Sequence, residues 1–369
     1  VDIVKPWLPA RVEDDIVYGR GACDDKGQCV AIVLAMRMLK AIADQLGLRP
    51  VRDLTCQFVV EEETGGNGSL ALARDDHSLP FDTIVVCEPT ELRLHPANRG
   101  AVWYELTLKR SGHEGISLLE LAAECVLALE REGRKLYEES EHPLFPSRPV
   151  QTCHGILGPW GSHPSGVNAV VGFCLVPAEG GKNDQLMRVV EPVIDEAISA
   201  YVDQYGDKTG EPDPDNASRN KVLRHYDMQC GREDLWIGVY GKSGHMGSTP
   251  LLDNAITKAA YLIHHLMEKR DELAEQAGVD SFKFCLAEAP PQSEQAPPTP
   301  EDPEVERRPC TDACEERLVL EGGQGFVPTH DIAEVTERMR AAVRQALEVY
   351  CKKWCAQDMP DTDIATITF

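Results

Sequence analysis

A strand-like segment that leads into Ser-Gly-His and then into a helix occurs twice, and this repeat limits the fold more than any other feature. The first copy has an alternating apolar run at 102–109 and reaches the tripeptide at 111–113. The second copy has such a run at 235–240 and reaches the tripeptide at 243–245. Each copy continues with a helix, a strand region and a second helix. This order predicts two split βαβ, or ferredoxin-like, repeats.

The later elements of the two copies follow the same sequence of types. The first helix, the glycine-marked strand region and the second helix are predicted at 118–129, 154–177 and 184–201 in the first copy and at 254–270, 318–327 and 332–354 in the second. A proline-rich, acidic stretch at 287–309 interrupts the second copy. This composition predicts an extended, exposed insertion.

The residues before the repeat have a different pattern. Residues 27–46 are apolar at helical spacing, whereas 54–60 and 83–86 are short β-branched runs of the kind buried in a parallel sheet. The sequence therefore predicts an α/β unit with a mostly parallel sheet. Its ligands are expected at the carboxyl ends of the strands, where open α/β sheets bind them.

Three acidic segments lie at such positions. The stretch GRGACDDKG at 19–27 combines turn-forming glycines with Asp24 close to a helix start, where a carboxylate binds a cation or simply caps the helix. The stretch EEETGG at 61–66 directly follows a predicted strand, and its three carboxylates repel one another unless a cation, a proton or solvent compensates. The stretch CEPT at 87–90 places Glu88 after the next strand, which is also common in an exposed turn.

The composition argues against some classes of binding partner. With 37 Lys plus Arg against 61 Asp plus Glu, the net charge of −24 repels phosphate backbones and argues against nucleic acid. No apolar run is long enough for a membrane span, and no signal-like start is visible. The 13 scattered cysteines predict reduced thiols and a cytoplasmic protein.

One cysteine pattern leaves an alternative open. Cys310 and Cys314, together with Cys351 and Cys355, could hold a structural zinc ion as four thiolates. The favoured interpretation is that each pair lies one helical turn apart as free thiols, because the tight CxxC spacing of zinc knuckles is missing.

The three acidic segments together resemble the metal-binding motifs of the dinuclear zinc peptidases and deacylases. This family includes acetylornithine deacetylase, succinyl-diaminopimelate desuccinylase, glutamate carboxypeptidase and carnosinase. The strand–Ser-Gly-His–helix segment is similar to the start of that family's lid domain. The resemblance implies the following division: a catalytic metal-binding domain at 1–98, lid repeats at 99–224 and 225–355, and a return to the catalytic domain at 356–369.

The resemblance also implies roles for individual residues. Asp24 matches the carboxylate that bridges two zinc ions, for which cobalt or manganese could substitute. Glu63 matches a ligand of one metal and Glu88 a ligand of the other, while Glu62 matches the general base. The family further implies a cis peptide bond between Asp24 and Asp25.

Other residues are assigned to supporting roles by the same resemblance. Asp2 matches the carboxylate that orients a metal-ligand His, and His113 or His245 matches the lid His that donates to the oxyanion. The expected His before Val1 and a late His ligand are both missing, so the chain is expected to be a fragment cut at both ends. As a fragment it would expose apolar segments and aggregate or be inactive; a shortened, inactive relative is the alternative.

The implied reaction is hydrolysis of the amide bond of an N-acyl amino acid or a small peptide by metal-activated water. The alternatives are a dipeptidase or carboxypeptidase of the same family, or an inactive binding or regulatory relative. A serine hydrolase is disfavoured because no G-x-S-x-G motif follows a predicted strand. The resemblance also implies a homodimer through the lid.

Overall fold

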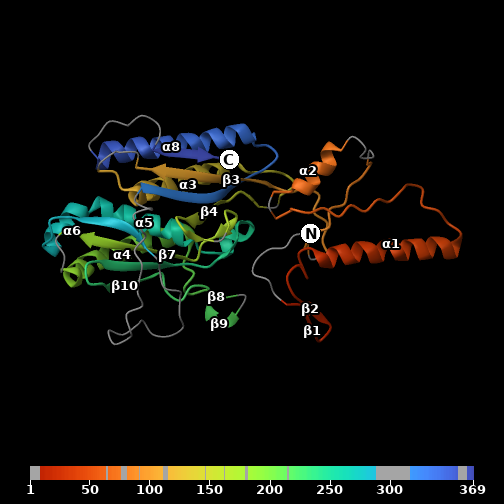
Figure 1. Cartoon of the computed structure of the whole chain (residues 1–369), viewed down its shortest axis with the longest axis horizontal. Coiled ribbons are helices and arrows are strands. Elements are labelled where there is room, and N and C mark those ends of the chain that lie inside the picture. The colour runs from red at the N-terminus through yellow and green to blue at the C-terminus, as the bar shows by residue number, and fades with distance from the viewer. Residues whose placement is uncertain are drawn as a thin grey trace. The chain divides into compact units, whose positions relative to one another are not determined.

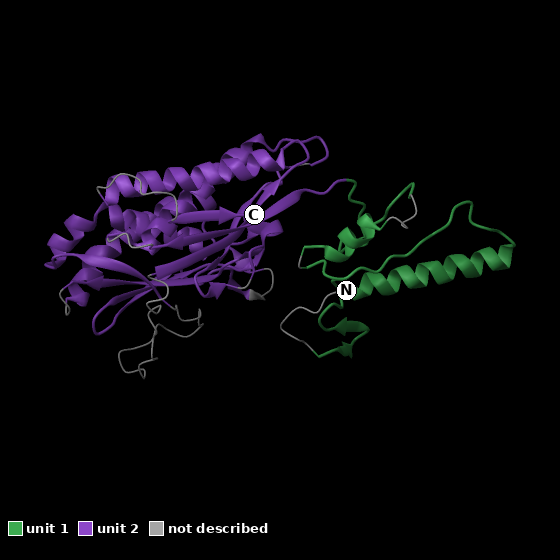
Figure 2. Ribbon diagram, turned by 45° about the horizontal axis from the view of Figure 1, so that its top comes forward, with its two compact units in different colours: residues 1–96 green, residues 97–369 purple. Residues whose placement is uncertain are grey.

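A computed structural model describes most of the chain, in two compact units, Val1–Pro96 and Ala97–Phe369 (Figure 2). The described residues are 9–63, 65–75, 81–90, 92–110, 115–145, 147–161, 163–178, 182–213, 216–287, 316–355 and 364–369.

The first unit contains a small hairpin and two helices. Strands β1 (Arg11–Glu13) and β2 (Ile16–Tyr18) pair in antiparallel fashion. Helix α1 (Lys26–Leu46) confirms the helix predicted at 27–46, and helix α2 (Asn67–Arg74) follows the acidic turn. Helix α1 ends at Gly47, whose left-handed backbone lets its N–H reach the carbonyl oxygens of the last turn.

The parallel sheet predicted for this unit is not formed by its described residues. The segments 54–60 and 83–86 have no assigned strand, and β1 with β2 is the one strand pair among the described residues before position 97. Ile84, Val85 and Val86 are 74%, 77% and 74% exposed. An apolar β-branched run needs hydrogen-bonded neighbours on both sides to become a central strand, and the described part of this unit supplies none.

The second unit contains two larger antiparallel sheets (Figure 1). In spatial order, the five-stranded sheet consists of β15 (Ala365–Thr368), β3 (Gly100–Lys109), β14 (Arg317–Phe326), β4 (Thr152–Leu157) and β5 (Trp160–Gly161). The four-stranded sheet consists of β10 (Tyr226–Cys230), β11 (Leu235–Tyr240), β7 (Val170–Pro177) and β13 (Phe282–Ala287). Two short pairs join β6 (Gly166–Val167) to β12 (Gly244–His245) and β8 (Pro212–Asp213) to β9 (Asn216–Asn220).

The strand pairing crosses the boundary predicted between the two repeats. Strand β14 lies in the range 225–355 but pairs with β3 and β4 of the range 99–224. Strand β7 of the first range pairs with β11 and β13 of the second. The residue ranges 99–224 and 225–355 therefore do not each form a sheet of their own. Strands far apart in the sequence pair because the packing of the folded chain brings them together.

Helices join the two sheets through one hydrophobic core. Helix α3 packs against both α8 and α5, and α5 packs against α4. Buried leucines, valines and isoleucines of both sheets and of these helices belong to a single cluster. The helix bounds are α3 (Leu118–Glu139), α4 (Asn183–Tyr205), α5 (Ala255–Glu268), α6 (Arg270–Ala277) and α8 (Ile332–Trp354), with the short 3-10 helix η1 (Met246–Leu251) before α5.

Polar residues fix where three of these helices begin. The side chains of Ser117, Asn254 and Asp331 each accept a backbone N–H from the first turn of α3, α5 and α8. Such caps satisfy donors that the helix itself leaves open. The sequence bounds 332–354 predicted for α8 are confirmed without change.

In the part of the chain that the structure describes, no helix combines the length and apolarity required to cross a bilayer. The described cysteines are free thiols. Cys351 and Cys355 lie one helical turn apart at the end of α8, as the free-thiol interpretation predicts, with Cys355 N–H donating to the carbonyl oxygen of Cys351. Cys310, Cys314 and all of the predicted insertion 287–309 except Ala287 lie outside the described residues.

Candidate functional site

The turn before α1 positions two adjacent carboxylates. Gly21 has a left-handed φ of +78°, and a Cβ on Gly27 would lie 2.6 Å from the carbonyl oxygen of Ala22, so both positions favour glycine. The turn closes when Lys26 N–H donates to the carbonyl oxygen of Gly21 at 2.9 Å. Asp24 and Asp25 therefore stand at the helix start, and the peptide bond between them is cis, as predicted.

The second acidic segment forms a tight turn before α2. Glu61 has a left-handed φ of +61°, and its carbonyl oxygen accepts the N–H of Gly66 at 2.7 Å. Its side chain accepts from Asn67 Nδ2 at 2.9 Å. The carbonyl oxygen of Glu62 accepts the N–H of Gly65 at 3.1 Å. Glu61 therefore stabilises the turn with both its side chain and its carbonyl oxygen. The roles of general base and metal ligand stay assigned to Glu62 and Glu63.

Carboxylates of the three acidic segments interact electrostatically, and this set is called here the acidic cluster. The pKa of Glu88 is raised to about 7. Loss of hydration is the first cause, and repulsion from Asp24, Glu62, Asp25 and Glu63 adds to it. The pKa of Asp25 is also raised, by burial and then by Asp24. Asp25 thus joins the cluster, which its position beside Asp24 could have suggested.

The fit of this cluster to a cation rests on two observations. The carboxylates repel one another, and Asp25 Oδ1 is a buried oxygen with no hydrogen-bond partner among the described residues. Both conditions are relieved by a cation or a proton, and carboxylate oxygens suit divalent metals. Within the same described ranges, however, no three His, Cys, Asp or Glu side chains are arranged closely enough to hold a metal ion. The donor chemistry fits a metal, while the ligand geometry is not formed.

Metal binding is expected to displace a proton from Glu88. With a pKa of about 7, this carboxyl is mostly protonated at pH 6 and mostly ionised at pH 8. Binding of Zn²⁺ or Mn²⁺ at about pH 6 should therefore release about one proton more than at about pH 8, and affinity should rise as the pH increases through 7. Calorimetry in buffers of different ionisation enthalpy measures this release.

The matched controls for that experiment are Glu88→Gln and Glu13→Gln. Glu88→Gln should abolish the pH-dependent release, whereas Glu13→Gln, which removes an exposed partner of Arg11, should leave it unchanged. Release that persists in Glu88→Gln would show that another group carries the proton.

The second Ser-Gly-His sequence lies in the second unit, on residues 241–253, called here the His245 loop. Strand β12 of this loop pairs with β6, and Met246 N–H donates to the carbonyl oxygen of Ser165 at 2.7 Å. Gly247 N–H donates to His245 Nδ1 at 3.0 Å. Because Nδ1 accepts this bond, the neutral ring carries its proton on Nε2. The exposed His245 side chain therefore presents an Nε2–H donor.

Arg99 also holds the His245 loop, although nothing in the sequence pattern indicates it. Its guanidinium donates to the carbonyl oxygen of Gly247 at 3.0 Å, to that of Pro149 at 2.6 Å and to Gln151 Oε1 at 2.7 Å. Burial lowers the pKa of this guanidinium. Arg99 ties the start of β3 to the loop that carries His245.

The predicted site residues thus fall into three groups. Asp24, Glu62, Glu63 and Glu88 belong to one electrostatic cluster in the first unit. His245 belongs to the second unit. Asp2 and His113 lie outside the described residues, so their assigned roles stay predictions.

A group of carboxylates on the turns of a mixed α/β chain suits the chemistry of metal-assisted hydrolases. The chain belongs to peptidase family M20/M25/M40, whose sequence model matches residues 2–361. This match confirms the resemblance to the peptidase and deacylase family.

Individual relatives align over a smaller part of the chain. A probable carboxypeptidase of Neosartorya fischeri is 32% identical over 142 residues, or 34% of this chain and 31% of the relative. A putative LysW-lysine/LysW-ornithine hydrolase of Pyrobaculum aerophilum is 33% identical over 142 residues, or 38% of this chain and 39% of the relative. A peptidase M20 domain-containing protein of Schizosaccharomyces pombe is 32% identical over 133 residues, or 34% of this chain and 32% of the relative. The alignments therefore span well under half the length of each relative.

Proposed function

We propose that this protein is a metal-dependent hydrolase that cleaves the amide bond of N-acyl amino acids or small peptides. The observation that carries the proposal is the electrostatic interaction of Asp24, Glu62 and Glu63 with Glu88, which adds to the loss of hydration in raising the pKa of Glu88 to about 7. Four carboxylates from three separate segments have no structural need to gather, and their mutual repulsion opposes it. Membership in a peptidase family supports the same chemistry.

We assign the roles of the individual residues by their match to the motifs of the family. Asp24, Glu63 and Glu88 would hold two zinc ions, or cobalt or manganese, which when bound supply a water that ionises near neutral pH. Glu62 takes the proton of the attacking water and returns it to the leaving amine. His245 donates its Nε2–H to the oxyanion, a role supported by the Gly247 bond that holds Nδ1 as an acceptor.

The second unit is proposed to be the lid, built from two ferredoxin-like repeats of which one is nested inside the other. The outer repeat uses β3, α3, β4, β14, α8 and β15, in the spatial order β15-β3-β14-β4. The inner repeat uses β7, α4, β10, β11, α5 and β13, in the spatial order β10-β11-β7-β13. Both orders place the first and third strands of the repeat at the centre, which supports a split βαβ plan. The free thiols support a cytoplasmic location.

The substrate class is tested by a hydrolysis screen. N-acetyl and N-succinyl amino acids are compared with dipeptides, each with zinc, cobalt or manganese, using the full-length protein. Turnover of acyl substrates is expected; turnover of dipeptides alone would favour the dipeptidase or carboxypeptidase alternative, to which the names of the carboxypeptidase relatives also point. Absence of both turnover and bound metal would favour an inactive binding relative.

A further inference from the structure

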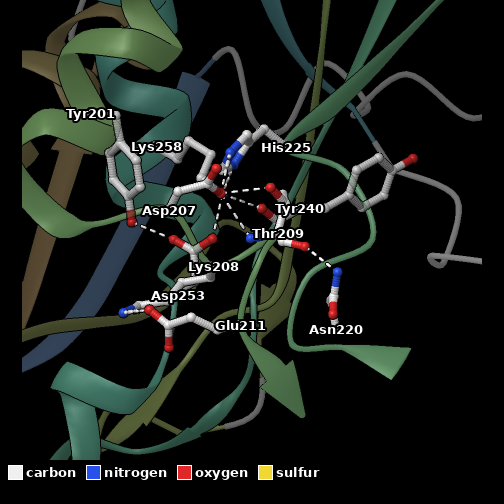
Figure 3. Close-up of polar contacts among 10 residues, drawn as sticks. All are labelled: Tyr201, Asp207, Lys208, Thr209, Glu211, Asn220, His225, Tyr240, Asp253 and Lys258. Atoms are coloured by element: carbon white, nitrogen blue, oxygen red, sulfur yellow. Dashed lines mark hydrogen bonds and ion pairs between the residues drawn. The ribbon is translucent and has the colours of Figure 1, made fainter. Parts of the chain in front are cut away.

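A buried ion pair includes the last residue of the His245 loop, and the proposed reaction does not use this pair. Lys258 of α5 and Asp253 have side chains that are 0% and 2% exposed, with Lys258 Nζ 2.5 Å from Asp253 Oδ2 (Figure 3). Tyr201 of α4 donates its hydroxyl to the other oxygen, Asp253 Oδ1, at 2.5 Å. Because two charges lose their hydration here, such a pair is costly to retain and is better explained by a requirement for position than for stability.

The ammonium of Lys258 is fully used by its surroundings. Besides Asp253, it contacts the carbonyl oxygen of Tyr240 at 2.6 Å and His225 Nδ1 at 3.1 Å. Since an ammonium can only donate, His225 Nδ1 accepts and His225 Nε2 carries the proton, 3.2 Å from Asp207 Oδ1 (Figure 3). Burial, and then Lys258, lowers the pKa of His225, which keeps the ring neutral. Lys258 thus contacts both Tyr240, the last residue of β11, and Asp253, which precedes the Asn254 cap of α5.

Tyr240 directly precedes the first residue of the His245 loop, and Asp253 is the last residue of the loop. Lys242 N–H donates to the carbonyl oxygen of Asp253 at 2.9 Å, and Asp253 N–H returns a bond to that of Lys242 at 3.2 Å. The Lys242 ammonium lies 2.9 and 3.1 Å from the two oxygens of Asp213, whose side chain is 1% exposed. A Cβ on Gly241 would lie 2.0 Å from the carbonyl oxygen of Asp253, so the two ends approach as closely as backbone allows. Both residues that close the loop are therefore fixed by buried charge pairs.

We propose that Lys258 and Asp253 are positioning residues for His245, which lock the closed base of the His245 loop and so restrict the position of the His245 ring. The inference rests on the proposed function, in which His245 donates to the oxyanion. Contacts at the far end of the loop, through Ser165 and Arg99, hold Met246 and Gly247, the two residues that follow His245. Fixing the base as well leaves the ring little freedom to move, and small displacements of a reacting group reduce rate steeply.

The test compares Lys258→Met with Lys269→Met. Lys269 pairs with Glu196 at 2.5 Å but is exposed, so its loss removes the same charge without disturbing the loop. Lys258→Met should speed hydrogen exchange of the His245 loop amides about tenfold and lower kcat about tenfold or more with little change in KM. Lys269→Met should change neither. Unchanged loop exchange in Lys258→Met would overturn the proposal.

A second readout separates positioning from general loss of structure. In a His245→Ala background, Lys258→Met should lower kcat no further, because the group it positions is already gone. An equal loss in both backgrounds would overturn the positioning role. If Lys258→Met fails to fold, the double variant Asp253→Asn/Lys258→Met removes both buried charges and takes its place in the same comparison. No hydrolysis by the unaltered protein would overturn the proposed function, whereas loop exchange reports on the base independently.

Discussion

Glu62→Gln in the full-length protein is expected to lower kcat by ~10²–10⁴-fold while bound metal stays at the wild-type level. Glutamine keeps the size of the side chain and loses the ability to take a proton from water. Its neighbour Glu63 is assigned to the metal, so Glu63→Gln should reduce bound metal, and added metal should restore part of its activity. Elemental analysis of the purified variants and steady-state kinetics at several metal concentrations measure both effects.

Glu61→Gln is the matched control for this pair. Glu61 lies on the same turn, but its carboxylate accepts from Asn67, and a glutamine oxygen can still accept that bond. Wild-type metal content and nearly wild-type kcat are expected. Equal metal loss in Glu62→Gln and Glu63→Gln would show that the two roles are assigned wrongly. A Glu61→Gln effect as large as that of Glu62→Gln would move the general base by one residue.

Local features of the fold were predictable because neighbouring residues determine them. The predicted bounds of helix α8 agree with the observed ones because its apolar positions recur at helical spacing. The turn before α1 and its cis bond followed from a stretch of nine residues that resembles a known motif. The electrostatic interaction of Asp24, Glu62 and Glu63 with Glu88 agrees with their expected proximity, whereas their roles at a metal site stay predictions.

Long-range pairing was not predictable in the same way. Strand β14 begins with an apolar run and continues with glycines, and nothing in this sequence indicates that the strand inserts between β3 and β4. The apolar runs at 54–60 and 83–86 have strand composition, yet composition cannot supply the neighbours that a strand needs.

Buried polar contacts could not be predicted from the sequence for a related reason. Lys258 lies in an apolar helix pattern where a lysine is normally expected on the exposed face, but its side chain is fully buried against Asp253. Arg99 reaches Gly247 across 148 positions of sequence. Such partners are chosen by the three-dimensional packing, so residue type and local spacing carry no signal for them.

His245→Ala is expected to lower kcat by ~10²–10³-fold with little change in KM, because a donor to the oxyanion acts mainly in the transition state. The loop backbone should be retained, since β12 pairs with β6 through main-chain bonds that alanine keeps. Loss of the bond between Gly247 N–H and the ring removes one local contact, which thermal unfolding of the variant would register.

The His113 comparison decides between the two Ser-Gly-His sequences. If His245 is the donor, His113→Ala should leave kcat within about threefold of wild type, and His245→Gln, whose amide N–H can replace Nε2–H, should recover part of the activity lost in His245→Ala. Loss of kcat in His113→Ala with a fully active His245→Ala would assign the oxyanion to the first copy. The bond from Gly247 N–H to Nδ1 favours His245 as the donor, because it leaves the proton of the neutral ring on Nε2.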